Sequence, residues 1–293
     1  MEQRIEIALP WGPVSALEWT PPSRPERTVL LLHGGGTDSA SLSWGATGPE
    51  LAEAGYRVIA PDHPGYGHTP SAPWRMTQER LVAHVGEVAD ALALGRYAIG
   101  GLSLGGGMTI GHVLQRPDRV TGAMLFGSYG IMPRLGDGRT ARVAHLISWT
   151  LVRSGLMTPL MRAYASSPAR MARGLRGLVR DDDRRTPELI AEVVHESRRE
   201  HALEAFEGWQ RDEVLPGRLR TDYSPRLGDV RLPTLLVHGE RDAGVPLAAA
   251  QSAATLLPDA RLVVAPGAGH WVQRDAPDLV LATIVGFLDD LEW

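Results

Sequence analysis

The chain has 293 residues, enough for a full hydrophobic core, and its lack of cysteine excludes disulfides, thiolate metal sites and thiol redox chemistry. All 30 basic residues are arginine, and the net charge of −4 argues against a nucleic-acid partner. No stretch approaches the roughly 18 uninterrupted apolar residues of a membrane span, and the first residues contain no apolar core of signal-peptide length. We therefore expect a soluble, cytoplasmic protein without a membrane partner.

The first elements indicate the edge of a sheet. Residues 4–9 and 14–19 alternate apolar and polar side chains around Pro-Trp-Gly-Pro at 10–13, which predicts an antiparallel hairpin. From Thr28 onward the strands become continuous apolar runs separated by segments of helical period, as in a sheet covered by helices on both faces. The clearest helix is predicted over residues 77–94, with Thr77 as its N-cap.

Two glycine-containing turns follow the next strands. The apolar run 28–32 leads directly into His-Gly-Gly-Gly at 33–36, whose backbone N–H groups can point at a developing oxyanion. A second turn, Pro-Asp-His-Pro-Gly-Tyr-Gly-His at 61–68, has the pattern D-x-x-G-x-G. We expect a structural role for the histidines in these turns, since their spacing is not that of metal ligands.

The segment Gly-Leu-Ser-Leu-Gly at 101–105 is the most informative motif. It lies between an apolar strand at 97–100 and a predicted helix at 104–115. A serine squeezed between a strand and a helix adopts a strained backbone, which needs glycine neighbours and exposes the hydroxyl beside the positive end of the helix. We therefore predict Ser103 as a nucleophile, with the N–H groups of Gly35 and Leu104 forming the oxyanion hole.

After a strand at 119–126, about 100 residues follow before the next apolar strand at 232–238. This segment is too long for a loop, so a helical insertion is expected. One of its helices should begin at Thr186-Pro187-Glu188. In another helix, several apolar residues fall on one face: Val143, Leu146, Ile147 and Leu151. The apolar excess of the whole insertion suggests a roof for an apolar substrate, although packing within the insertion explains most of its apolar residues equally well.

The last strands supply the partners for Ser103. The apolar run 232–238 is followed by Asp242 at the strand's carboxyl end, and Asp242 is preferred over Glu240 as the acid. The run 261–265 leads to His270 on a glycine-flexed loop, where an imidazole can take the Ser103 proton and return it to a leaving group. The chain order of serine, acid and histidine is the one used by the α/β-hydrolase fold.

These motifs together resemble the α/β-hydrolase superfamily from the first strand to the last helix. The resemblance implies a mostly parallel eight-stranded sheet flanked by helices, with a core domain at 1–131 and 230–293 and a helical cap at 132–229. It implies a catalytic triad of Ser103, Asp242 and His270 that needs neither cofactor nor metal, and Gly36 and Trp271 as substrate-binding residues.

Our leading hypothesis is a serine esterase for a small or medium apolar substrate, working as a monomer or homodimer. The HGGG and Gly-His-Trp segments also resemble meta-cleavage-product hydrolases, which cut carbon–carbon bonds in vinylogous diketones and use a cap arginine for the substrate carboxylate. Lactonases, thioesterases, cofactor-free haloperoxidases and non-enzymatic ligand receptors are further alternatives. Four arginines of the cap could pair with a substrate carboxylate, but we favour a solvent-facing position for them: Arg162, Arg170, Arg173 and Arg176.

Overall fold

The computed structural model describes residues 1–22, 27–136, 141–165, 167–199 and 202–293. Its centre is an eight-stranded sheet with the order β1-β2-β4-β3-β5-β6-β7-β8. The strands are β1 (Glu2–Leu9), β2 (Gly12–Trp19), β3 (Thr28–Leu32), β4 (Arg57–Pro61), β5 (Tyr97–Leu102), β6 (Val120–Phe126), β7 (Thr234–Gly239) and β8 (Ala260–Ala265).

The strand directions confirm the predicted fold class. β1 and β2 form the antiparallel edge, and every pairing from β4–β3 through to β7–β8 is parallel. Parallel strands need crossover helices, which cover both faces of the sheet and exclude water from the strands between them. This burial explains why the strands from β3 to β7 read as continuous apolar runs in the sequence.

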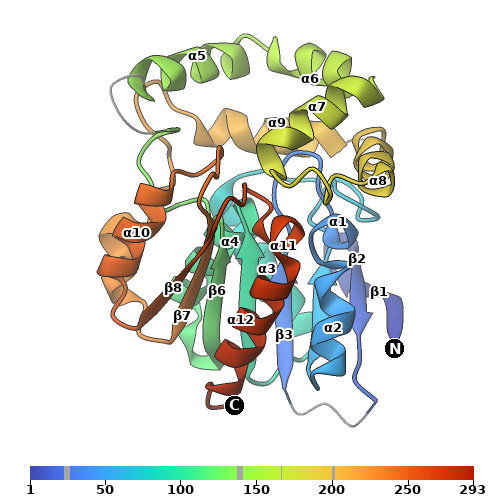
Figure 1. The fold of residues 1–293 in the computed structure, drawn as a ribbon, viewed down its shortest axis with the longest axis vertical. Coiled ribbons are helices and arrows are strands. Elements are labelled where there is room, and N and C mark those ends of the chain that lie inside the picture. The colour runs from blue at the N-terminus through green and yellow to red at the C-terminus, as the bar shows by residue number, and fades with distance from the viewer. Residues whose placement is uncertain (23–26, 137–140, 166, 200–201) are drawn as a thin grey trace.

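Two helical layers cover the sheet (Figure 1). On one face lie α1 (Ala40–Trp44), α2 (Thr47–Glu53), α11 (Val272–Asp275) and α12 (Pro277–Asp289); on the other lie α3 (Gln78–Ala91), α4 (Leu104–Gln115) and α10 (Leu247–Leu256). Short 3-10 helices occupy Pro117–Arg119 and Ser224–Asp229. The Thr77 hydroxyl caps α3 by accepting from the Arg80 N–H at 3.2 Å, as the sequence predicts.

Between β6 and β7 the chain forms helices α5 to α9, which we call the cap. They are α5 (Ala141–Arg153), α6 (Met157–Ala165), α7 (Pro168–Leu178), α8 (Pro187–Ser197) and α9 (Ala202–Glu213). Figure 1 shows the cap lying over the carboxyl ends of the parallel strands, with α5 and α6 farthest from the sheet. The loops that follow β3, β5, β6, β7 and β8 therefore all open toward the cap.

Within the described part of the chain, no helix is both long and apolar enough to cross a membrane.

Candidate active site

Ser103 occupies a sharp turn between β5 and α4. Its backbone has φ 50° and ψ −112°, a conformation that L side chains rarely adopt. The flanking glycines are needed for space, because a Cβ on Gly101 would lie 2.2 Å from the carbonyl of Gly105, and a Cβ on Gly105 would lie 2.5 Å from the carbonyl oxygen of His33. The turn thus presents the serine at the N-terminus of α4, where helix partial charges favour a developing anion.

His270 and Asp242 form a direct pair at the ends of β8 and β7. The Nδ1 atom of His270 lies 2.8 Å from Oδ2 and 3.0 Å from Oδ1 of Asp242. The Asp242 side chain is fully buried, and its Oδ1 also accepts from the N–H groups of Gly244 and Val245. Such a carboxylate fixes the orientation of the imidazole ring and stabilises the imidazolium form.

The electrostatics of Asp242 suit this role. Burial raises its pKa, but the hydrogen bond and positive charge of His270 and the Val245 N–H outweigh burial and hold the pKa below its usual range. Glu240, the competing acid of the sequence analysis, instead accepts a hydrogen bond from the Gly267 N–H at 2.8 Å and is exposed. The structure therefore places Asp242, not Glu240, beside His270.

The glycine loop after β3 is held by a buried carboxylate. Asp38 accepts from the N–H of Gly34 at 2.7 Å, from the N–H of Ser39 at 2.8 Å and from the hydroxyl of Ser43. Burial raises the pKa of Asp38 to about 7, although these hydrogen bonds oppose the shift. The following glycines, Gly35 and Gly36, line the same cavity as Ser103, and the N–H of Leu104 belongs to the unpaired first turn of α4.

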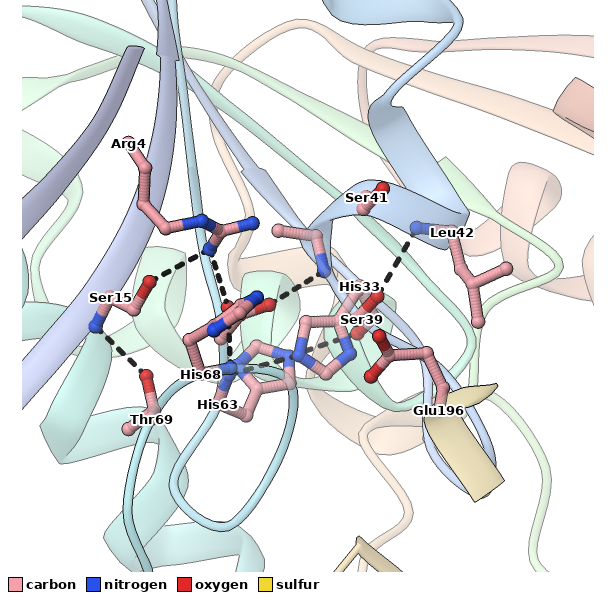
Figure 2. A network of polar contacts seen from close by, with 12 residues as sticks. Arg4, Ser15, His33, Ser39, Ser41, Leu42, His63, His68, Thr69 and Glu196 are labelled. Atoms are coloured by element: carbon pink, nitrogen blue, oxygen red, sulfur yellow. Dashed lines mark hydrogen bonds and ion pairs between the residues drawn. The ribbon is translucent and has the colours of Figure 1, made fainter. Parts of the chain in front are cut away.

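The histidines near this loop are structural (Figure 2). The rings of His33 and His63 lie 3.8 Å apart, and the Nε2 atom of His33 accepts from the His63 N–H at 2.9 Å. Burial lowers the pKa of His33 to about 3 and that of His63 well below its usual value. In the described residues, no group of three or more His, Cys, Asp or Glu side chains is arranged to hold a metal ion.

The D-x-x-G-x-G turn locks the two loops together. Asp62 is fully buried and accepts from the Arg4 guanidinium at 3.0 Å and from the N–H groups of Ala40 and His68. Gly67 has φ 51°, and a Cβ there would lie 2.2 Å from Cγ of Asp62. This turn positions the loop that precedes α1 and takes no part in the chemistry.

Ser103 and His270 line a cavity of about 360 Å³ between the core and the cap. The size is within the range of small-molecule sites. The cap contributes mostly apolar side chains, among them Met161, Tyr164, Met171, Leu175, Val193, Phe206, Trp209 and Gln210. Gly36 and Trp271, the two predicted substrate-binding residues, also line it. Apart from His270 and two tyrosines, none of the described lining residues carries an ionisable side chain.

Sequence reasoning missed two aromatic residues on α9. Phe206 lies so close to the HGGG loop that a Cβ on Gly35 would be 2.6 Å from its ring, and it stacks on Trp209 with ring centroids 5.6 Å apart. The indole N–H of Trp209 donates to Oε1 of Gln78 on α3. The i,i+3 spacing of the two aromatics gives one apolar face, but nothing in the sequence says that this face meets the HGGG loop.

Two other residues of the site also emerge only from the structure. Tyr129, just after β6, lines the cavity, and its hydroxyl donates to the buried Glu213 at 2.7 Å. Asp275 accepts from the N–H groups of Gly269, Arg180 and Asp181, so it ties the His270 loop to the segment after α7. Their signal in the sequence is weak, because both lie outside the motifs.

The four cap arginines are exposed, in agreement with the solvent-facing position favoured from the sequence, and do not line the cavity; one of them, Arg162, pairs with Glu204 at 3.2 Å. The apolar residues of the cap form the cavity roof only in part. Val193 of α8 lines the cavity, whereas Val143, Leu146 and Ile147 of α5 point to solvent with exposures of 49% to 61%. The helical periodicity of α5 identifies an apolar face but not the side of the cap on which it lies.

The chain is similar to known hydrolases along most of its length. The family profile described as alpha/beta hydrolase fold matches residues 27–277. A 2-hydroxy-6-oxo-2,4-heptadienoate hydrolase of Pseudomonas putida is 31% identical over 252 residues, which cover 84% of this chain and 83% of that protein.

Two solved structures show the same similarity. The meta-cleavage product hydrolase CumD of Pseudomonas fluorescens IP01 has a TM-score of 0.76 at 26% identity and covers 94% of this chain and 95% of its own. A thermophilic esterase of Thermogutta terrifontis has a TM-score of 0.73 at 25% identity and covers 98% of both chains. Carbon–carbon hydrolases and an esterase thus share this architecture.

Proposed function

The chain belongs to the α/β-hydrolase family, and from this premise we propose that it is a serine hydrolase which transfers an uncharged, apolar acyl group to water. One observation carries the proposal: the strained Ser103 and the His270–Asp242 pair open into a cavity whose described lining is mostly apolar and contains no arginine, aspartate or glutamate. Nucleophile, base and orienting acid follow the strand ends in the order that this fold uses.

In the proposed mechanism, Ser103 Oγ attacks the substrate carbonyl carbon while His270 takes the hydroxyl proton. Asp242 holds Nδ1 of the ring and stabilises the imidazolium. The N–H groups of Gly35 and Leu104 bind the oxyanion. When the intermediate collapses, the bond to the leaving group breaks, its electron pair goes to that group, and His270 returns the proton. Water, activated by His270, then releases the acid from Ser103 and restores the serine.

The sequence-based leading hypothesis is hydrolysis of an ester bond. The names of the relatives instead favour hydrolysis of a carbon–carbon bond. CumD is named as a meta-cleavage product hydrolase, and the Pseudomonas putida relative is named as the hydrolase of a 2-hydroxy-6-oxo dienoate, a compound that contains no ester bond. In a vinylogous diketone the departing carbon is conjugated with a second carbonyl, which accepts the electron pair before protonation. We therefore rank carbon–carbon hydrolysis first.

Ester hydrolysis is the second candidate, and the charge of the cavity favours it. The Pseudomonas putida relative is named for a dienoate, which is a carboxylate, whereas the described lining of this cavity contains no arginine. Burying a carboxylate without a partner is costly, so the substrate should be neutral inside the cavity. A neutral apolar ester meets this condition, and the structural similarity to an esterase agrees with it.

The test is a paired substrate panel. Purified wild type, Ser103→Ala and the control Ser252→Ala, an exposed serine on α10, are given p-nitrophenyl esters of increasing acyl length and a neutral vinylogous 1,5-diketone with a phenyl ketone. We expect turnover of at least one class, abolished in Ser103→Ala and retained in the control. The class that turns over identifies the bond.

A p-nitrophenyl phosphonate probe makes the test independent of the bond. Ser103 Oγ attacks phosphorus, p-nitrophenolate leaves, and one equivalent of probe remains on the enzyme. Labelling of Ser103 without turnover of either class points to another acyl substrate or to a ligand receptor. Absence of both labelling and turnover in the folded wild type would refute the proposal of a nucleophilic serine.

A further inference from the structure

The outer surface of the cap is unusually apolar. In the described part of the chain eight large apolar side chains are strongly exposed, and five of these lie on or between α5 and α6. We call them the docking face: Val143, Leu146, Ile147, Leu156 and Leu160, each 49% to 61% exposed. Figure 1 shows α5 and α6 as the layer of the cap farthest from the sheet. Exposed apolar side chains gathered in this way mark an interaction surface.

The same region is strongly basic. Residues 141–178 contain six arginines and no aspartate or glutamate, although the whole chain has a net charge of −4. All six are exposed: Arg142, Arg153, Arg162, Arg170, Arg173 and Arg176. One of these arginines, Arg162, pairs with Glu204 of α9, and the region as a whole keeps an excess of positive charge beside its exposed apolar side chains.

Although the sequence led us to expect no membrane partner, we propose that this face docks onto the surface of an anionic lipid bilayer. The side chains of the docking face would enter the boundary between headgroups and acyl chains, and the surrounding arginines would contact lipid phosphates. Amphipathic helices with apolar and arginine-rich sides bind membranes in this manner, and each basic residue near an anionic surface strengthens binding about fivefold. A second copy of the chain fits less well, because a symmetric contact would bring like charges together.

The docking face adjoins the proposed active site. On α6, Leu160 points outward, while its neighbour Met161 lines the cavity. A lipophilic substrate dissolved in the bilayer would therefore meet the helix that forms the cavity wall. This last step rests on the proposed function, whereas bilayer docking itself does not.

The experiment measures flotation of the protein with vesicles of phosphatidylcholine alone or mixed with equal parts of phosphatidylglycerol. We expect wild type to bind the anionic vesicles at least tenfold more tightly than the neutral ones. The double variant Leu146→Asp/Ile147→Asp should lose tenfold or more, and Arg142→Gln/Arg153→Gln about twentyfold. The matched control Leu279→Asp changes an exposed leucine on α12, which belongs to the core and not to the docking face, and should bind like wild type.

Three results would overturn the proposal: no flotation of wild type at low salt, equal flotation of the Leu146→Asp/Ile147→Asp variant, or a concentration-dependent dimer that this variant abolishes without any vesicle binding. Circular dichroism checks that each variant is folded. Because Ser103→Ala should float like wild type, a failure of docking can be distinguished from a failure of the proposed catalysis.

Discussion

The core holds its functional groups through backbone geometry, whereas the cap contributes side chains to the same cavity. In the core, Ser103 depends on a positive φ angle and on glycines that leave no room for a Cβ. In the cap, residues such as Met161 and Phe206 line the cavity from helices whose other faces are exposed or packed. The geometry that chemistry needs is local and strict, while the shape of the cavity depends on how helices pack.

This difference leads to an expectation about variants. Changes in the core should lower kcat, because they remove groups that act on the transition state. Changes in the cap should alter which acyl group is accepted. Single substitutions in each region test that division.

Replacing the proposed triad acid should have the largest effect. Asp242→Ala removes the buried carboxylate that holds Nδ1 of His270, and kcat should fall about ten-thousandfold. Steady-state kinetics on the best substrate of the panel measure the loss. The control is Glu240→Ala, which should stay within about threefold of wild type. Near-normal kcat in Asp242→Ala would mean that another group orients His270.

A methyl group on the oxyanion loop should reveal the contact between core and cap. In Gly35→Ala the new Cβ would collide with the Phe206 ring, so either the loop or the ring must move. Loss of one oxyanion donor costs about a hundredfold in kcat. The double variant Gly35→Ala/Phe206→Ala should recover part of this loss. If the double variant is no better than the single one, the cap does not fix the loop.

Enlarging the cavity on its cap side should change the preferred acyl chain length rather than kcat. Met161→Ala creates space in the cavity, and the preferred acyl chain should lengthen by about two carbons, with each added methylene contributing about fourfold in kcat/KM. The comparison uses p-nitrophenyl esters, or the phosphonate series if esters are not cleaved. Leu160→Ala is the matched control, because it removes an outward side chain from the same helix. An equal shift in both variants would contradict the assigned cavity wall.

The smallest effect concerns pH and stability. Because burial raises the pKa of Asp38 to about 7, the native state keeps this proton between about pH 4 and 7, where the unfolded state loses it. The contribution of this proton to the free energy of unfolding is therefore fully present below about pH 4. It is lost as pH rises toward 7, by at most about 1.4 kcal/mol per pH unit. Buried His33 and His63 act in the opposite direction, since burial lowers their pKa values.

The Asp38→Asn variant isolates the contribution of the Asp38 proton, because asparagine does not titrate. The Tm of wild type should fall relative to the Tm of Asp38→Asn as pH rises from 4 to 7. Thermal unfolding followed by circular dichroism over that range measures it. A constant difference would show that Asp38 does not titrate in this window.

Sequence patterns predict most of the core, because its signals are local. The apolar run 28–32 coincides with β3, the predicted helix 104–115 coincides with α4, and the hairpin pairs as expected. The motifs also name Ser103, Asp242 and His270, which the structure brings to one end of the sheet, since carboxyl ends of parallel strands meet there. Domain boundaries and the roles of these residues remain predictions.

The cap resists prediction for a physical reason. Its helices carry apolar residues on more than one face. Helical periodicity identifies an apolar face, but it does not predict which element or solvent that face contacts. The face of α5 with Leu146 points to solvent, while Phe206 and Trp209 on α9 reach the cavity. Likewise, the position of an arginine in the chain does not say whether it meets substrate, and Arg162 does not.

The most direct test of the account compares two phosphonate probes that differ only at the distal end of the acyl tail, where one has an isopropyl group and the other a carboxylate. The measured quantity is the second-order rate of Ser103 labelling by intact-protein mass, with Ser103→Ala as the blank. We predict labelling at least tenfold faster with the neutral tail, and a reduced or inverted ratio in Gln210→Arg, which adds a guanidinium to the cavity wall. Equal or faster labelling of wild type with the carboxylate tail would contradict the claim that this core acts on neutral groups selected by an uncharged cap.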